Sequence, residues 1–431
     1  GPLYGQCEHA CNDMPILDPV KNVATRFVLP TTADMPLALG PGNAGAAKIL
    51  QPSAYWGEEV IWDSKANNHN SMFDRKGRVW LAATGHTNQN PDWCKKGSDH
   101  PSAKLHPLDA TNRRVTMYDP KTGKYTPYLT CFGSHHLQFG YDANETVWMS
   151  GGNQVLGWIN TRMLDETGDI QKSQGWTSFV LDSNGNGQRD AHTEPGQPAD
   201  AAKDRRISMS FYAVMPSPVD GSIWGTHRAN PGAILRVAPG SNPPHTALAE
   251  VYNVPLPGFG PRGGDIDKQG RVVVSLASGH MGIFDRRKCK GPLNGPTATG
   301  AHCPEGWTLH PFPGPQFANV TETGSAEASY YTWVDQFDTF GLGRNVPMAT
   351  GNANESLLAF AQGRWVNLRV PYPMGFYAKW MDGRIDDPRG GWKGRGLWST
   401  YATRTPFHVE GGKGTTSKVV KFQLRPDPLA K

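Results

Sequence analysis

The chain has 431 residues and a formal net charge of +5, and its 50 glycines and 36 prolines interrupt it too often for long helices. Its basic residues are scattered rather than clustered, so the composition gives no support for nucleic-acid binding. No run of 18 apolar residues is present, which argues against a membrane-spanning helix, whereas 37% hydrophobic residues with 14 Trp and 13 Tyr are typical of a folded protein.

A hairpin unit recurs along the chain. Its clearest copy, HNSMFDRKGRVWLAATGH at residues 69–86, contains a strand, a turn at Lys76 and Gly77, and a second strand rich in Val, Trp and Leu. Related copies lie at residues 135–152, 210–227 and 261–280. A lone hairpin is only marginally stable, so copies spaced by roughly 50 to 70 residues predict the blades of a β-propeller. We therefore predict an all-β fold in which residues 1–431 form a single β-propeller domain with six or seven blades.

The two ends of the chain are predicted to close the ring. Residues 1–20 are expected to be an N-terminal tether, and residues 24–30 form a strand without a hairpin partner nearby. The final strand, residues 418–425, is similarly isolated. Propellers commonly pair their terminal strands within one blade, which leaves no open sheet edge, so Phe27 and Phe422 are predicted to share a sheet. The blades are predicted at residues 60–131, 135–182, 208–255, 261–314, 327–370 and 375–425.

Residues 182–206 do not follow the repeat and are predicted to be a loop insertion. Oxygen-bearing side chains recur there at Asp182, Asn184, Asn186 and Asp190, and Gly187 provides a turn. This pattern matches the first nine positions of a calcium loop, in which alternate side chains point at one cation. Position twelve holds Thr where a bidentate Glu is usual. We predict a Ca²⁺ ion in the 182–194 loop that orders the chain, and the alternative is a polar turn without an ion.

The six cysteines lie in glycine- and proline-rich loops without the Cys-x-x-Cys spacing of a zinc or redox site. Cys289 and Cys303 bracket a 13-residue loop that has no core of its own, so a disulfide is predicted across residues 289–303. Disulfides indicate an oxidising compartment, and hence a secreted or periplasmic protein. The other predicted pairings are Cys94 with Cys131, and Cys7 with Cys11 either as one tight bridge or in two separate ones.

Four blocks of the repeat carry a family resemblance. The sequences FDRKGRVWLAAT, YDANETVWMSGG, DIDKQGRVVVSLASG and YDPKTGKYTPY resemble the repeats of the virginiamycin B lyase-like propellers. The resemblance implies the propeller fold far more than it implies a chemistry. The lyase is a seven-bladed propeller that opens a cyclic ester by elimination, using a divalent cation, a histidine base and carboxylates. Its active-site motif has no residue-by-residue match in this chain.

Histidines fall at matching positions of the repeats. The start of the first strand and the end of the second strand of an antiparallel hairpin lie on the same side, so such residues should meet at one mouth of the central channel. Neutral imidazoles that share a centre suit a transition metal ion such as Cu, Fe or Zn. His69, His136 and His280 are expected to share that centre. The full predicted channel-mouth site is His69, His86, His135, His136, His227, His280 and His408.

Three further residues are predicted on the same rim and, with His136, complete the candidate catalytic set. Glu327 precedes an innermost strand and is a candidate ligand or general base. Arg262 and Lys379 occupy matching positions and are candidates for holding an anionic substrate or its developing negative charge. The ordinary alternatives are a turn residue for Arg262 and a solvated strand residue for Lys379.

Three functions are compatible with these features. The first is a secreted or periplasmic metalloenzyme that acts on a small organic substrate by metal-assisted elimination or hydrolysis, with a rim histidine or Glu327 moving a proton. The second is a copper- or iron-dependent oxidoreductase on the same histidine rim. The third is a non-catalytic binding or scaffold propeller, in which the histidines are incidental and no stoichiometric metal is bound.

Overall fold

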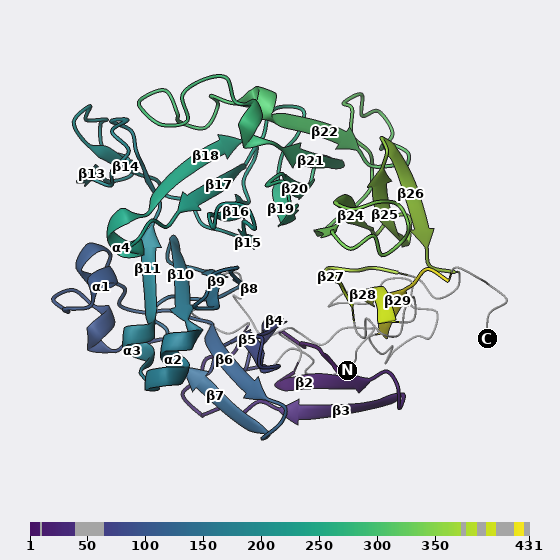
Figure 1. The fold of residues 1–431 in the computed structure, drawn as a ribbon, viewed down its shortest axis with the longest axis horizontal. Helices are drawn as coiled ribbons and strands as arrows, with labels where there is room; N and C mark the ends of the chain where they lie inside the picture. Colours follow the sequence, from purple (N-terminus) through teal and green to yellow (C-terminus); the bar gives the residue numbers. More distant parts are fainter. Residues whose placement is uncertain (9–10, 39–63, 372–375, 386–393, 402–417, 426–431) are drawn as a thin grey trace.

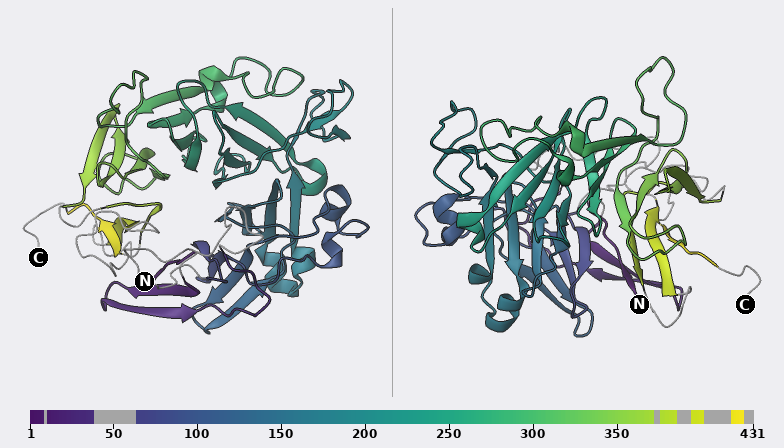
Figure 2. Two further views of the ribbon diagram at one scale, coloured as in Figure 1. Left: turned by 180° about the vertical axis from the view of Figure 1, so that it is seen from behind. Right: turned by 45° about the horizontal axis from the view of Figure 1, so that its top comes forward.

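The computed structural model describes residues 1–8, 11–38, 64–371, 376–385, 394–401 and 418–425. These residues confirm the predicted all-β propeller. They form seven sheets around one central axis, with the short helices outside the ring (Figures 1 and 2). Within the described ranges, no helix is both long and apolar enough to cross a membrane.

Each blade is an antiparallel meander whose first strand lies nearest the channel (Figure 1). The first two of these blades contain β4 (His69–Phe73), β5 (Val79–Ala83), β6 (Arg114–Asp119) and β7 (Lys124–Tyr128), then β8 (His136–Phe139), β9 (Thr146–Ser150), β10 (Val155–Asn160) and β11 (Gln174–Ser178). The next contains β15 (Val214–Pro216), β16 (Ile223–His227), β17 (Ala233–Ala238) and β18 (Leu248–Asn253), extended at its outer edge by β12 (Val180–Leu181), β14 (Asp204–Arg206) and β13 (His192–Thr193).

The remaining blades complete the ring. Their strands are β19 (Pro261–Ile266), β20 (Val272–Leu276), β21 (His280–Phe284) and β22 (Trp307–Pro311), then β23 (Thr332–Asp335), β24 (Val346–Gly351), β25 (Ser356–Ala361) and β26 (Arg364–Arg369), then β27 (Met381–Ile385), β28 (Arg395–Tyr401) and β29 (Lys418–Phe422). The short helices are α1 (Pro101–Leu105), α2 (Thr161–Thr167), α3 (Ile170–Ser173) and α4 (Pro243–Thr246), with 3-10 turns η1 (Asp92–Cys94), η2 (Arg286–Lys288) and η3 (Pro304–Gly306). Around the channel, β4 contacts β8, β8 contacts β15, β15 contacts β19, β19 contacts β23, and β23 contacts β27.

The N-terminal segment forms its own sheet, which lies between the blade of β4–β7 and that of β27–β29 (Figure 1). It consists of β1 (Leu3–Tyr4), β2 (Asp13–Asp18) and β3 (Val23–Val28), so the prediction of a tether at residues 1–20 is wrong. The predicted shared terminal blade is also wrong, because Phe27 pairs within this sheet and Phe422 within that of β27–β29. The N-terminal sheet is held by apolar packing against Val79 and Leu81 of the adjacent blade.

An aspartate near the end of the first strand explains why the hairpin repeats. The Oδ1 atom of Asp74 accepts hydrogen bonds from the backbone N–H groups of Lys76 and Arg78, both at 2.9 Å, and these bonds close the turn. Its Oδ2 atom accepts a bond from Trp80 Nε1 at 2.9 Å, which ties the turn to the buried second strand. Carboxylates that accept from the backbone two and four residues later recur at Asp142, Asp267 and Asp335.

The apolar core lies largely between neighbouring blades. Trp80 is fully buried, stacks on Tyr128 of its own blade and meets Phe139 of the next blade edge-on, with ring centroids 6.2 Å apart. Trp224 and Phe284, from two other adjacent blades, pack with centroids 6.0 Å apart. Since each blade provides one wall of a shared core, the ring is stable only when its blades pack together.

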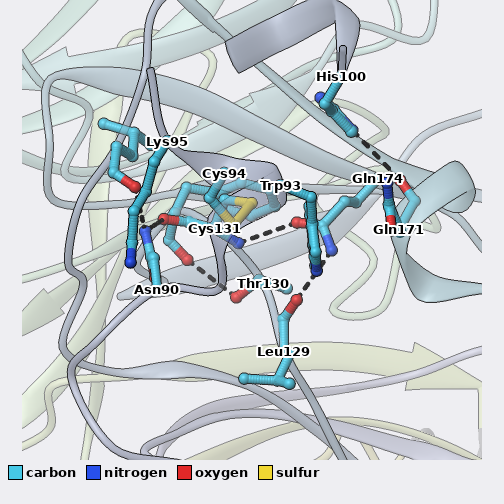
Figure 3. Close-up of a disulfide and its surroundings, with 12 residues drawn as sticks. Asn90, Trp93, Cys94, Lys95, His100, Leu129, Thr130, Cys131, Gln171 and Gln174 are labelled. Carbon is cyan, nitrogen blue, oxygen red and sulfur yellow. Dashed lines mark hydrogen bonds between the residues drawn. A yellow bond between two sulfur atoms is a disulfide. The ribbon is translucent and has the colours of Figure 1, made fainter. Parts of the chain in front are cut away.

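The six cysteines form three disulfides, Cys7–Cys11, Cys94–Cys131 and Cys289–Cys303. The two bridges predicted from loop position are confirmed, and the first pair forms one tight bridge. Figure 3 shows how the second bridge joins the insertion after β5 to the chain after β7. Beside it, Gln174 of the next blade accepts from the backbone N–H of Cys131 and donates to the carbonyl of Leu129, both at 2.9 Å. The insertion is therefore fixed to two blades.

Candidate metal centre at the channel mouth

Three histidines from two neighbouring inner strands meet at the channel mouth. His69 begins β4, His136 begins β8, and His135 directly precedes it. The ring centroids of His69 lie 4.6 Å from His135 and 5.1 Å from His136, and those of His135 and His136 lie 4.2 Å apart. Their candidate ligand nitrogens all lie within 4.8 Å of one another. Metal–nitrogen bonds of about 2 Å place nitrogens on a shared ion within about 4 Å of each other, so small side-chain rotations suffice for binding.

The Nδ1 contacts of two of these rings leave the Nε2 atom available to a metal. His136 Nδ1 lies 2.7 Å from the carbonyl oxygen of Tyr212, and since a carbonyl only accepts, Nδ1 carries the proton and Nε2 a lone pair. His69 Nδ1 faces the Glu8 carboxylate at 3.5 Å, while its Nε2 atom is buried without a hydrogen-bond partner. Imidazoles that ligate metals typically hold a carbonyl or carboxylate with the other nitrogen in this way.

The surroundings keep all three imidazoles neutral. Burial is the main cause that lowers the pKa of His69 and His135 well below the ordinary value of 6.5, and it lowers the pKa of His136 to about 4. The positive charges of Arg113 and Lys379 add to the effect at each ring. Because a metal binds the neutral imidazole, this environment keeps the ligands in the competent form at neutral pH.

Arginine, lysine and tyrosine side chains surround the triad. Tyr212 packs edge-on against His136, with ring centroids 4.8 Å apart, and donates a hydrogen bond to the Tyr330 hydroxyl at 3.0 Å. The Arg262 guanidinium lies 4.3 Å from the centre of the Tyr330 ring, and the Lys379 ammonium lies 5.1 Å from it. The two predicted cations, Arg262 and Lys379, therefore lie against the ring of Tyr330. Tyr330 is hydrogen-bonded to Tyr212, which packs against His136.

The remaining predicted histidines lie elsewhere. His280 begins β21, the third strand of its blade, and its ring nitrogens lie 3.0 Å from Ser278 Oγ and 3.3 Å from Thr323 Oγ1. The prediction that His280 shares a centre with His69 and His136 is wrong, and His135 takes the third place. His227 ends β16 and contacts the Ser210 backbone, and His86 follows β5; neither belongs to the triad. His408 lies outside the described residues.

The Glu327 carboxylate is held by hydrogen bonds to a turn of its own blade. Its carboxylate accepts hydrogen bonds from the backbone N–H groups of Ala353 and Asn354, at 2.7 and 3.0 Å, and from the Asn354 side chain. Burial raises the pKa of Glu327 above its ordinary value. These bonds fasten the turn between β24 and β25 to the start of its blade. A carboxylate that does contact the triad is that of Glu8, which the sequence did not reveal because Glu8 lies beside the Cys7–Cys11 bridge, outside the repeats.

The 182–194 loop is held by hydrogen bonds among its predicted calcium-loop residues, whose two asparagine oxygens accept from the backbone of the loop itself. Asp182 accepts from the backbone N–H groups of Gly185, Asn186 and Gly187, and Asp190 accepts from the side-chain amides of Asn184 and Asn186. A further carboxylate, Asp204 on β14, joins them: its Oδ2 accepts from the Asp190 N–H at 2.7 Å, and its buried Oδ1 has no hydrogen-bond partner. Burial, followed by the charges of Asp182 and Asp190, raises the pKa of Asp204.

The sequence matches no protein-family profile and no curated protein. Among solved structures, the chain is similar to virginiamycin B lyase from Staphylococcus aureus, with 11% sequence identity, a TM-score of 0.47, and coverage of 93% of this chain and 87% of that chain. A streptogramin B lyase structure shows 11% identity and a TM-score of 0.45, with coverage of 93% and 86%. These are propellers of the group that the repeats resemble, and the likeness concerns the fold alone.

Proposed function

We propose that the protein is a metal-dependent enzyme whose active site is the channel mouth and whose metal is held by His69, His135 and His136. The observation that supports this most directly is the convergence of three neutral imidazoles, with all candidate ligand nitrogens within 4.8 Å of one another. Three protein ligands leave a coordination position open for water or substrate, as is usual in catalytic sites. A metal there would polarise a substrate oxygen or activate a bound water.

The residues around the triad fit a reaction that develops negative charge on oxygen. Burial raises the pKa of Tyr212, so its hydroxyl stays protonated and donates to Tyr330, and the Arg262 guanidinium lies over the Tyr330 ring. Fixed donors and cations of this kind stabilise an enolate or oxyanion as it forms. Elimination or hydrolysis on a small organic substrate is therefore the reaction class that we propose. A set of three imidazoles suits copper and iron as well as zinc. If one of those two ions occupied the triad, a redox reaction would be favoured instead.

Metal analysis of protein purified without chelator tests this proposal. We expect about one transition metal ion per chain in the wild type and its loss in His135→Ala and His136→Ala. His245→Ala is the matched control, since His245 lies exposed on α4. Melting temperatures check that the triad variants remain folded. Wild-type metal content in both triad variants, or no bound transition metal in the wild type, would contradict the proposal and leave a binding or scaffold propeller.

We also propose a Ca²⁺ ion in the 182–194 loop. Burial, and then the charges of Asp182 and Asp190, raise the pKa of Asp204, and a hard divalent cation bound beside these carboxylates would offset both effects. The carboxylate of Asp204 would supply the negative charge that a Glu provides at position twelve of the usual calcium loop. Such an ion would order the insertion rather than take part in the chemistry at the channel mouth.

A further inference from the structure

The mouth of the channel collects positive side chains from four blades. Arg262 lies on β19, Arg113 precedes β6, Arg228 follows β16, and Lys379 precedes β27. The Arg228 guanidinium lies 4.5 Å from the centre of the Tyr212 ring, and that of Arg262 lies 5.6 Å from the same ring. Tyr212 is also the ring that contacts His135 and His136, so both arginines reach the tyrosine that adjoins the triad.

One carboxylate of the described residues, that of Glu8, lies against two of these cations. Glu8 lies 3.6 Å from Arg113 and 3.9 Å from Lys379, in addition to its contact with His69. Ion pairs between described residues include neither Arg228 nor Arg262, and the buried Nε atom of Arg262 has no hydrogen-bond partner. The carboxylate of Asp265, on the same strand as Arg262, accepts instead from the backbone N–H groups of Ile266 and Val334.

We propose that the substrate of this centre carries an oxyanion, either a carboxylate or a phosphate, which Arg262 and Arg228 bind beside the metal. This inference rests on the proposed metal site, because a divalent ion on three neutral imidazoles adds two positive charges that Glu8 alone does not neutralise. A guanidinium matches the geometry of either oxyanion with paired N–H donors. A guanidinium over a tyrosine face is also held in place by cation–π attraction.

The tyrosine pair adds neutral hydroxyl groups to the same place. Tyr212 donates to Tyr330 at 3.0 Å, and Arg262 contacts both rings. An oxyanion on Arg262 would therefore lie near phenolic hydroxyls as well as guanidinium groups. This combination binds the anionic end of a substrate while the triad acts on another part of it.

Calorimetric titration with inorganic phosphate and with malonate, at low ionic strength, tests the anion site on chelator-treated and on metal-loaded protein. Arg262→Gln and Arg228→Gln should each weaken binding of the preferred anion by roughly tenfold to a hundredfold, as expected for loss of a charged hydrogen bond. Arg228 is exposed, so its substitution tests the site even where Arg262→Gln disturbs folding. Arg287→Gln, at an exposed arginine that pairs with Asp285, is the matched control and should bind as the wild type does. The tighter of the two anions identifies the substrate class.

Three outcomes separate this inference from the proposed function. Equal affinity in wild type, Arg228→Gln, Arg262→Gln and Arg287→Gln would overturn the anion site, as would no measurable binding of either anion. Stoichiometric metal without arginine-dependent anion binding would reject the inference and leave the metalloenzyme intact. Arginine-dependent binding by a protein that holds no transition metal would support the anion site and reject the metal centre.

Discussion

The Oε1 atom of Glu8 lies 3.5 Å from the Nδ1 atom of His69. This contact joins the N-terminal segment to the first inner strand, where an isolated bridge also pairs Glu8 with Asn68. A carboxylate on the second nitrogen of a ligating imidazole fixes the ring orientation and makes the ligand more basic. The N-terminal sheet therefore contributes to the candidate metal centre as well as to the ring.

Glu8→Gln should weaken metal binding by roughly 10- to 100-fold, the usual effect of losing such a supporting group. The amide keeps the shape of the side chain and removes its charge, so the ring should remain folded. Competition with a chelator of known affinity measures the change. Glu166→Gln, at an exposed pair with Arg162, is the control and should bind metal as the wild type does. Unchanged affinity in Glu8→Gln would show that the contact does not support the metal.

Stability should depend on pH through Asp265. Burial is the main cause that raises the pKa of Asp265 from 3.8 to about 7. Between these values the folded state binds more protons than the unfolded state, so the free energy of unfolding falls as pH rises through this range. Between pH 5 and pH 8 this loss amounts to about 3 kcal/mol, and Asp265→Asn should abolish it.

Urea unfolding of both proteins at pH 5 and pH 8 measures this difference. The relevant quantity is the change with pH, because the amide also loses one acceptor for a backbone N–H and lowers stability at every pH. Asp92→Asn, at a fully exposed side chain, should leave the pH dependence unchanged. Parallel curves for wild type and Asp265→Asn would contradict the prediction.

The propeller could be predicted from the sequence because the turn and strand residues that define each hairpin lie close together in the chain. Asp74 and Trp80 mark one hairpin, and their hydrogen bond shows why turn and strand residues recur together. The closure of the ring was missed because Pro15 interrupts the apolar pattern of β2, although β2 pairs along its whole length with β3. Strand pairing between segments without a repeat depends on tertiary packing, which a single sequence does not specify.

The candidate site was predicted in part. His69 and His136 were found because each begins the first strand of a repeat. His280 was misplaced because a short turn after β20 puts it at the start of the third strand, away from the channel. Glu8 and Asp204 could not be found from spacing, since each comes from a segment distant in sequence from the residues it joins. The pair Cys7 and Cys11 beside it was the available signal that Glu8 is held in place.

The buried aspartate of the first complete blade should be important for stability. Asp74→Ala removes the acceptor of Trp80 Nε1 and of Arg78 Nε, and leaves both donors without this partner near the core. Loss of one member of such a buried, charged network typically costs about 3 to 5 kcal/mol. Asp119→Ala is the control, because Asp119 caps a comparable turn on the exposed outer hairpin. Equal unfolding free energies for the two variants would contradict this prediction. They would show that Asp74 stabilises the protein through its turn alone and not through its bonds to Trp80 and Arg78.

Calcium should reverse the effect of Asp204 on thermal stability. In chelator, the buried Asp204 is repelled by Asp182 and Asp190, so Asp204→Asn should unfold at an equal or higher temperature than the wild type. In calcium, the same substitution removes a ligand, and the variant should unfold at a lower temperature. An ion that binds only the folded state adds about 2.7 kcal/mol of stability at a concentration 100 times its Kd.

Asp200→Asn, at an exposed pair with Lys203 in the same insertion, is the control and should follow the wild type in both conditions. Differential scanning calorimetry of the three proteins measures the shifts, and equal wild-type melting temperatures in calcium and in chelator would exclude an ordering ion in this loop.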